Sequence, residues 1–148
     1  DHEGKFIGLL GIGKNITSFK LMEQVLERER SLLRLLVDSL PDSIYVKDTE
    51  GHRILANPAD VHSLGLASEM EVIGKTEMDL MPLVVAQQIR REEQQILESG
   101  IAIIEREELS WDAAGNPRWQ LVSKYPLYDE KGNSIGLLGI SRDITTWK

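Results

Sequence analysis

Residues 105–145 read EREELSWDAAGNPRWQLVSKYPLYDEKGNSIGLLGISRDIT. The segments DAAGNP and YDEKGN within this stretch are rich in Asp, Gly, Asn and Pro, which favour tight turns. Around them lie three runs, residues 101–111, 118–127 and 135–143, rich in aliphatic, aromatic and β-branched side chains. Because short turns join neighbouring antiparallel strands, the stretch predicts three such strands in succession.

A second group of elements precedes these strands. Residues 44–57 alternate apolar and polar side chains on both sides of a turn at Gly51, which predicts a hairpin. Residues 83–98 predict the longest helix of the domain, with one apolar stripe and Gly100 as its stop. The order of elements along the chain, with two strands first, then several helices, then three strands, predicts an α+β fold. We expect a five-stranded antiparallel sheet with helices on one face, preceded by a long N-terminal helix.

The N-terminal helix is predicted over residues 18–40, where no Gly or Pro occurs before Pro41. Its apolar residues recur at heptad spacing on a seam that Glu29 interrupts. The seam consists of Met22, Leu26, Leu33, Leu36 and Leu40. One interpretation is a coiled coil that pairs two chains in a homodimer. The alternative is a single amphipathic helix that lies on its own domain.

The two ends of the chain repeat each other. When residues 1–20 are aligned with residues 129–148, 11 of the 20 pairs are identical, and several glycines coincide. This predicts a tandem array of domains. Residues 1–17 would be the remnant last strand of an upstream domain, and the helix over 18–40 would be a linker. A complete domain would follow over 41–146, with 147–148 starting a downstream helix. The alternative is two unrelated strands of similar composition.

Composition excludes several classes of protein. The chain has 148 residues, a net charge of −7, 41% hydrophobic residues and no cysteine, so disulfides, thiolate zinc sites and iron–sulfur clusters are excluded. The net negative charge argues against binding to nucleic acid and against direct contact with an anionic membrane. No nucleophile, phosphate-loop or kinase motif occurs, and the acidic turns lack calcium-loop spacing. We therefore predict a cytoplasmic protein that is not an enzyme and has no metal site.

Three segments in order resemble a PAS domain with its C-terminal PAC segment: LPDSIYVKDTEGHRILANPA, VIGKTEMDLMP and residues 105–145. The resemblance covers residues 31–146, and residues 4–17 resemble the end of another such domain. It implies a cytoplasmic sensor and dimerisation module. By resemblance, such modules occur mostly in histidine kinases, and also in diguanylate cyclases, phosphodiesterases, chemoreceptors and transcription regulators. The parent protein can be membrane-anchored.

A sheet covered on one side encloses a space in which a small molecule can bind. If the apolar face of the strand over 118–127 points inward, we expect it to line this space with residues of the other elements. The candidate pocket residues are Ile44, Val46, Met78, Val85, Ile89, Trp119, Leu121, Ser123, Tyr125 and Ile140. The alternative is a packed core without a ligand. Glu105 is expected opposite Lys124 as an exposed cross-strand ion pair.

The sequence does not identify a cofactor. Haem-binding domains that this chain resembles carry their histidine on the long helix, which has none here, and His62 lies on a shorter one. Flavin photosensors of this kind need a reactive cysteine, which the chain lacks. Haem and cysteinyl-flavin are therefore disfavoured.

Asp143, Ile144 and Thr145 match the terminal signature of the resembled family. Asp or Thr can cap the helix that follows the last strand. The resemblance implies that these residues also relay a signal from sheet to helix, and the alternative is that they are only a helix cap. The resulting hypothesis is a homodimeric sensory module of a multidomain signalling protein, a histidine kinase in most cases, that binds a small molecule. The alternative is a ligand-free spacer or dimerisation scaffold that contacts other domains of its parent protein.

Overall fold

The computed structural model describes residues 2–112 and 114–148, with side chains from residue 16 onward. It divides into two compact units, one ending at Ser39 and the other beginning at Leu40, and each is described by itself. In the part of the chain that is described, no helix combines the length and the apolar character that crossing a membrane requires.

The first unit is one helix, α1 (His2–Ser39). It confirms the helix predicted from residue 18 and ends before Pro41, since a proline disfavours helical backbone in the residue before it. Its described apolar side chains are exposed: Ile16, Phe19, Leu21, Met22, Val25, Leu26, Leu32, Leu33, Leu35 and Leu36. Four predicted seam residues, Met22, Leu26, Leu33 and Leu36, belong to this exposed set, and Leu40 is exposed just after the end of α1. Exposed apolar surface of this extent is typical of an interaction surface.

The strand expected within residues 1–17 is helical instead, because α1 extends back to His2. The physical reason is that a single strand leaves its backbone N–H and C=O groups without partners, whereas a helix satisfies them within one segment. The conformation expected for this segment is therefore corrected. The origin of the repeat in a tandem array, and the domain boundaries drawn from it, stay predictions.

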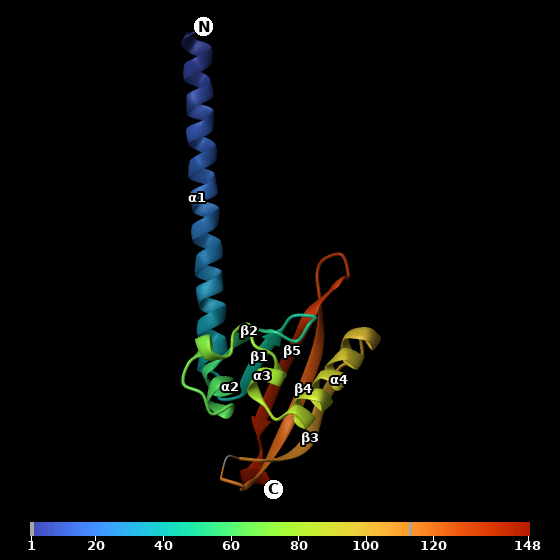
Figure 1. Cartoon of the computed structure of the whole chain (residues 1–148). Coiled ribbons are helices and arrows are strands. Elements are labelled where there is room, and N and C mark those ends of the chain that lie inside the picture. The colour runs from blue at the N-terminus through green and yellow to red at the C-terminus, as the bar shows by residue number, and fades with distance from the viewer. Residues whose placement is uncertain (1, 113) are drawn as a thin grey trace. The chain divides into compact units, whose positions relative to one another are not determined.

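Five strands of the second unit form one antiparallel sheet in the order β2-β1-β5-β4-β3 (Figure 1). They are β1 (Ser43–Lys47), β2 (Arg53–Ala56), β3 (Ile103–Trp111), β4 (Pro117–Tyr128) and β5 (Ser134–Asp143). The first and last strands of the unit pair at the centre of the sheet, with Ile44 opposite Ile140. The predicted fold class is confirmed.

The three hairpins share one turn design. Each turn begins with an aspartate whose Oδ1 accepts backbone N–H groups two and four residues later, all at 2.9 Å. A glycine three residues after the aspartate has a positive φ between 83° and 89°. The pairs are Asp48 with Gly51, Asp112 with Gly115, and Asp129 with Gly132. The sequence pattern Asp-x-x-Gly therefore fixes all three turns.

The helices between β2 and β3 cover one face of the sheet (Figure 1). They are α2 (Pro58–Ser63), the short helix η1 (Glu69–Glu71), α3 (Glu77–Leu80) and α4 (Leu83–Ser99). Asn57 caps α2 by accepting the backbone N–H of Asp60 at 3.0 Å. Thr76 and Asp79 form a capping box on α3, and Gly100 ends α4 with a φ of 71°. The stop at Gly100 agrees with the sequence analysis.

The described apolar core between helices and sheet is small. Ala56, Val61 and Val72 are buried together, and Leu64, Leu66 and Leu80 pack against them. This cluster lies beside α2 rather than under α4. The space between α4 and the sheet is filled mainly by polar and charged side chains, and the candidate site lies there.

Candidate functional site

A cavity of about 540 Å³ lies between the sheet and helices α2, α3 and α4. All five strands contribute to its lining. Charged residues are prominent in that lining: Lys47, Arg53, Arg118 and Lys124 are the cations, and Asp60, Glu77, Glu92 and Glu108 are the carboxylates. Apolar residues are about as numerous and include Leu64, Met81 and Val122. The cavity therefore has a mixed lining of charged and apolar residues, whereas the sequence predicts a mainly apolar pocket.

Two of the predicted pocket residues, Val85 and Ile89 of α4, line this cavity. The other eight do not line it: Ile44, Val46, Met78, Trp119, Leu121, Ser123, Tyr125 and Ile140. Met78 is 47% exposed on α3. Binding of a ligand by any of these residues stays a prediction.

The strand β4 shows why the predicted and observed linings differ. The lining residues of β4 are Arg118, Gln120, Val122 and Lys124. Trp119, Leu121, Ser123 and Tyr125 alternate with them, so they lie on the opposite face of the sheet. The sequence analysis placed the apolar face inward, whereas the helices cover the polar face. The outer face therefore carries the larger aromatic and aliphatic side chains.

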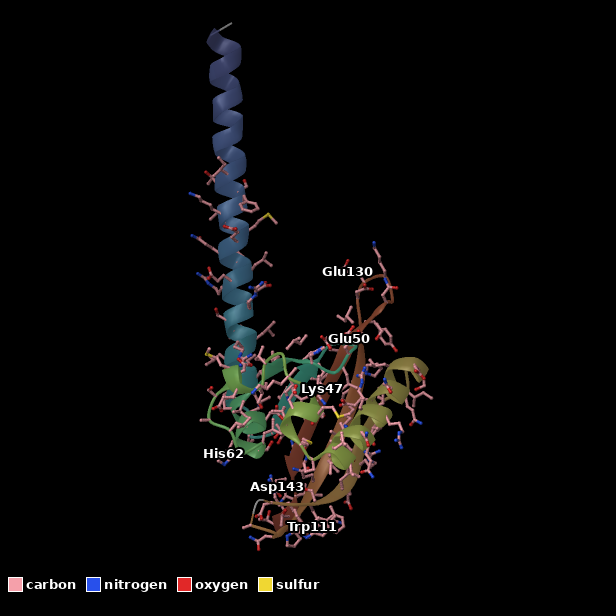
Figure 2. All side chains as sticks on the ribbon, in the orientation of Figure 1. Lys47, Glu50, His62, Trp111, Glu130 and Asp143 are labelled. Carbon is pink, nitrogen blue, oxygen red and sulfur yellow. The ribbon has the colours of Figure 1, made fainter. Side chains whose placement is uncertain are left out.

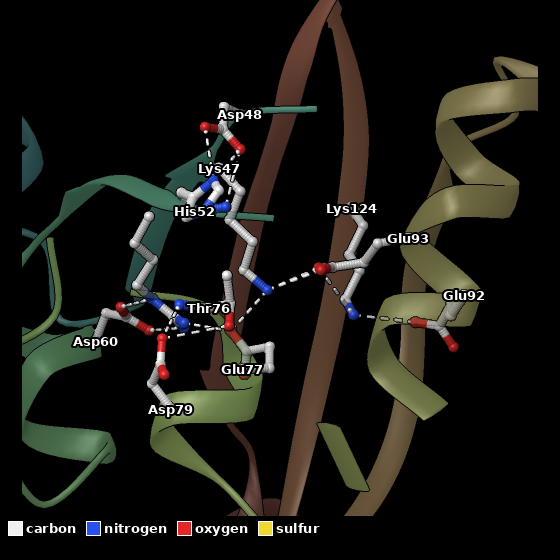
Figure 3. Close-up of polar contacts among 11 residues, drawn as sticks. Lys47, Asp48, His52, Asp60, Thr76, Glu77, Asp79, Glu92, Glu93 and Lys124 are labelled. Atoms are coloured by element: carbon white, nitrogen blue, oxygen red, sulfur yellow. Dashed lines mark hydrogen bonds and ion pairs between the residues drawn. The ribbon is translucent and has the colours of Figure 1, made fainter. Parts of the chain in front are cut away.

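A chain of alternating charges crosses the interior (Figure 3). Lys47 of β1 is at its centre, with its Nζ 2.7 Å from Glu77 of α3 and 2.8 Å from Glu93 of α4. The side chains of these three residues are 2%, 6% and 3% exposed. Since buried charges are stable only when they are paired, these contacts connect the sheet to both helices.

The chain of charges continues in both directions. On one side Arg53 of β2 pairs with Glu77 and lies 3.1 Å from Asp60 of α2. On the other side Lys124 of β4 lies 3.0 Å from Glu92 and 3.6 Å from Glu93. Arg106 of β3 extends it toward the surface through Glu92, at 2.8 Å. We call this set the ion network: Asp60, Arg53, Glu77, Lys47, Glu93, Lys124 and Glu92.

The position of Lys124 in the ion network corrects one expectation. Lys124 lies opposite Ile103 rather than Glu105, because β3 has an irregularity between Ile103 and Arg106. Glu105 has a φ of 50°, and its N–H donates to the Ser123 hydroxyl at 2.9 Å. The exposed ion pair expected between Glu105 and Lys124 is therefore absent among the described residues, and Lys124 pairs inside the fold.

The network places carboxyls in two different electrostatic environments. Burial alone would raise the pKa of Glu77, but Lys47 and Arg53 together lower it below its ordinary value. Burial raises the pKa of Asp60, although Arg53 opposes that effect. Burial also raises the pKa of the Tyr45 hydroxyl well above its ordinary value of 10.0.

The ring of Tyr45 lies beneath two cations of the network. Its centroid is 4.9 Å from Nζ of Lys47 and 4.6 Å from Cζ of Arg53, within the range of a cation–π contact. Tyr45 lies opposite Gly139 of β5. A Cβ at Gly139 would be 2.1 Å from Cζ of the ring, so the absence of a side chain there makes room for Tyr45.

The predicted relay residues form a compact joint at the end of β5. Ile144 is buried, and its N–H donates to the carbonyl of Trp119 at 2.8 Å. The N–H of Trp119 donates to the Thr145 hydroxyl at 3.0 Å, and Asp143 accepts the N–H of Thr145 at 2.9 Å. The hydroxyl of Thr145 also donates to Asp143. The joint therefore ties the start of the short helix η2 (Thr145–Trp147) to β4.

Arg118 connects this joint to the cavity. Its Nε lies 3.4 Å from Asp143, and its side chain lines the cavity. Figure 2 shows Asp143 and Trp111 at the same end of the sheet, and Lys47 farther along it. Hydrogen bonds on Asp143 from Thr145 lower the pKa of this carboxyl, so it stays ionised near neutral pH.

Most of the network residues were missed by the sequence analysis. One available signal was Glu93, which lies four residues after Ile89 and three before Ile96, within the apolar stripe of α4. A charge on an apolar stripe indicates a buried partner. Lys47 gave no such signal, because it alternates with Ile44 and Val46, which were expected to face the helices. His62, in contrast, is exposed on α2.

Comparison with known proteins agrees with this geometry. Residues 37–148 match a protein family described as PAS fold. The PAS domain from Bordetella pertussis BvgS has a solved structure that superposes with a TM-score of 0.64 at 25% identity. The superposition covers 80% of this chain and 88% of that one.

Two relatives are known as signalling proteins. A diguanylate cyclase of Vibrio cholerae is 27% identical over 135 residues, which are 90% of this chain and 42% of that protein. The methanogenesis regulatory histidine kinase FilI of Methanothrix harundinacea is 26% identical over 137 residues, 93% of this chain and 15% of the kinase. The chain spans less than half the length of these relatives.

Proposed function

The chain belongs to the PAS fold family, and we propose that it is a dimeric sensory module of a larger cytoplasmic signalling protein, of the histidine kinase type. The match over residues 37–148 carries this proposal, because relatives along most of the chain include a histidine kinase and a diguanylate cyclase. The module itself is proposed to be non-catalytic. Assignment of its last strands to a PAC segment stays a prediction.

Dimerisation is proposed to use α1. The described part of this helix exposes Leu26 and Leu33 by 60% and 64%, at positions seven residues apart. Phe19 extends the same row by another seven residues and is 62% exposed. Such a row is buried when two helices pair. Pairing of α1 with a second copy would join two chains in a dimer.

Signal transfer is proposed to pass through the joint formed by Asp143, Ile144 and Thr145. Two hydrogen bonds link this joint to Trp119 of β4, and a third joins Thr145 to Asp143 at the end of β5. A change in the position of β4 would therefore alter the direction in which the following helix leaves the domain. Arg118 offers a route from the cavity to the joint, because it lines the one and pairs with the other.

A second candidate function is a ligand-free dimerisation scaffold. The observation that favours it is the ion network, whose buried side chains occupy the centre of the space between sheet and helices. The two functions differ in whether a small molecule is retained. Native mass spectrometry of the freshly purified chain distinguishes them, since a sensor is expected to show an added mass that is lost on denaturation and a scaffold none.

Dimerisation is tested by analytical ultracentrifugation of Leu33→Asp. Leu35→Asp is the matched control, because Leu35 is 66% exposed on the same helix but lies off the heptad seam. We expect Leu33→Asp to weaken the dimer by roughly tenfold or more, since it places a charge in an apolar seam. Leu35→Asp is expected to leave the dimer intact. Equal dimerisation of both variants and the wild type contradicts pairing through this seam.

A further inference from the structure

The end of the cavity near the joint differs from its centre. Arg118 and Gln120 of β4 and Ser141 of β5 line the cavity and also an adjoining hollow of about 790 Å³ between α2 and the β3–β4 turn. These three residues therefore lie where the two spaces meet. Molecules that enter through the hollow would meet this group before they reach the ion network.

The pairing of the carboxylates around the cavity disfavours a cationic ligand. Within the described residues, every lining carboxylate already has a cationic partner: Asp60 with Arg53, Glu77 with Lys47, Glu92 with Lys124, and Glu108 with Arg106. A cationic ligand would have to displace one of these partners. The cations at the centre, Lys47 and Lys124, each contact two carboxylates as well.

Arg118 has the fewest ion pairs among the lining cations. Its recorded ion pair is with Asp143, through Nε at a distance of 3.4 Å, and the two side chains are 29% and 49% exposed. A guanidinium group has terminal nitrogens that bind a carboxylate in a planar, two-bonded geometry. The terminal nitrogens of Arg118 have no ion pair in the described part of the chain, so they are available to an anionic group.

Ser141 supplies a second, independent observation. Its hydroxyl oxygen is buried, yet it has no hydrogen-bond partner among the residues that the structure describes. Because a buried polar atom without a partner is costly, its presence at the cavity wall indicates a further polar group at this place. Ser43 lies directly opposite Ser141 in the sheet and lines the same space.

We propose that this cavity binds a small hydrophilic organic anion, with its carboxylate held by Arg118 and a second oxygen hydrogen-bonded to Ser141. Leu64 of the segment after α2 would cover its carbon skeleton, because it lines the same two spaces as Arg118. This inference rests on the proposed sensory function and specifies the class of molecule sensed.

The test is isothermal titration calorimetry of the full chain with three hydroxycarboxylates: lactate, malate and citrate. Their uncharged amides serve as chemical controls, and glycerol phosphate tests whether a phosphate ester is taken instead. Three variants are compared with the wild type: Arg118→Gln, Ser141→Ala and Arg142→Gln. Arg142→Gln is the matched control, because it removes the same charge from a neighbouring strand at an exposed residue that pairs with Asp42.

We expect at least one carboxylate to bind while its amide does not. Arg118→Gln is expected to weaken binding by roughly tenfold to a hundredfold, as loss of a charged hydrogen bond does. Ser141→Ala is expected to weaken it several-fold, and Arg142→Gln to leave it unchanged.

Binding of no carboxylate, equal binding of the amides, stronger binding of glycerol phosphate, or equal binding by Arg118→Gln and wild type would each overturn the inference. Circular dichroism of every variant checks that it is folded. A chain that binds no anion but still dimerises through α1 would contradict the ligand class alone. Absence of a dimer in the wild-type chain would contradict the proposed function instead.

Discussion

Lys47 of β1 and Glu93 of α4 form a buried ion pair across 46 residues of sequence, with Nζ 2.8 Å and 3.1 Å from the two carboxylate oxygens. The pair attaches the longest helix of the domain to the centre of its sheet. In most sheets with helices on one face, apolar packing holds the helices to the sheet. Here the attachment depends on charge, so its strength depends on complete pairing inside the fold.

The first prediction concerns this pair. Lys47→Met leaves Glu77 and Glu93 buried without their shared cation, so we expect it to lower the free energy of unfolding by about 3–5 kcal/mol. Urea denaturation of the chain measures the change. Lys131→Met is the control, because Lys131 lies exposed in the β4–β5 turn. A loss below about 1 kcal/mol, the value typical of surface pairs, would show that water reaches the pair.

Lys47→Met combined with Glu93→Gln extends this prediction. If the two side chains stabilise the fold mainly through each other, the double variant is less destabilised than the sum of the single variants. Additive losses would mean that Lys47 acts chiefly through Glu77, which lies 2.7 Å away.

The second prediction concerns Gly139. A Cβ at this position would lie 2.1–2.4 Å from three atoms of the Tyr45 ring, so Gly139→Ala must displace the ring from beneath Lys47 and Arg53. Overpacking of this kind is expected to cost about 1–3 kcal/mol of stability. In a Tyr45→Ala background the same substitution should have little further effect, because the clash is gone. Equal losses of stability in the wild-type and Tyr45→Ala backgrounds would contradict this explanation.

The third prediction is a loss of stability in acid. The pKa of Glu77 is lower in the folded protein than its ordinary value of 4.5, so the unfolded chain binds the proton more readily. The stability that Glu77 contributes is present above its unfolded pKa and is lost as the pH falls through its folded pKa. Asp60, whose pKa burial raises, acts in the opposite direction, and its contribution is lost as the pH rises through its folded pKa.

Urea denaturation between about pH 6 and about pH 3 measures this dependence. Glu77→Gln is expected to be less stable than the wild type near neutral pH and to lose less stability on acidification. Glu130→Gln, in an exposed turn, should follow the wild-type curve. Parallel curves for Glu77→Gln and the wild type would exclude Glu77 as a source of the acid dependence.

The sequence predicts the order of elements well, because local signals determine them. Asp48 with Gly51 fixes one turn, and Gly100 fixes the end of α4. The face of the sheet that the helices cover could not be predicted in the same way. Trp119 and Arg118 alternate on β4, and hydrophobicity alone assigns the tryptophan face inward. The charged face is inside because Lys124 and Lys47 find carboxylates on α4, and such long-range pairs leave no periodic signal.

The N-terminal segment shows a second limit of sequence analysis. Residues 1–17 resemble a strand because they repeat the sequence of β5. In β5 the same pattern is stabilised by β1 on one side and β4 on the other. The first unit provides no such neighbours, and its backbone is helical from His2. A sequence pattern therefore predicts a strand only where pairing partners are present.

The last prediction concerns the joint at Thr145. Thr145→Val keeps the shape of the side chain but removes the oxygen that accepts the N–H of Trp119 at 3.0 Å. The amide of Trp119 should then exchange with solvent several-fold faster, while global stability falls by only about 1 kcal/mol, the usual net value of one hydrogen bond. Hydrogen exchange followed by NMR measures both quantities. Thr146→Val, one residue along, is the control and should leave the exchange of Trp119 unchanged. Unaltered exchange in Thr145→Val would mean that the end of β4 is held by the bond from Ile144 to the Trp119 carbonyl instead, and the proposed relay would lose its connection to Thr145.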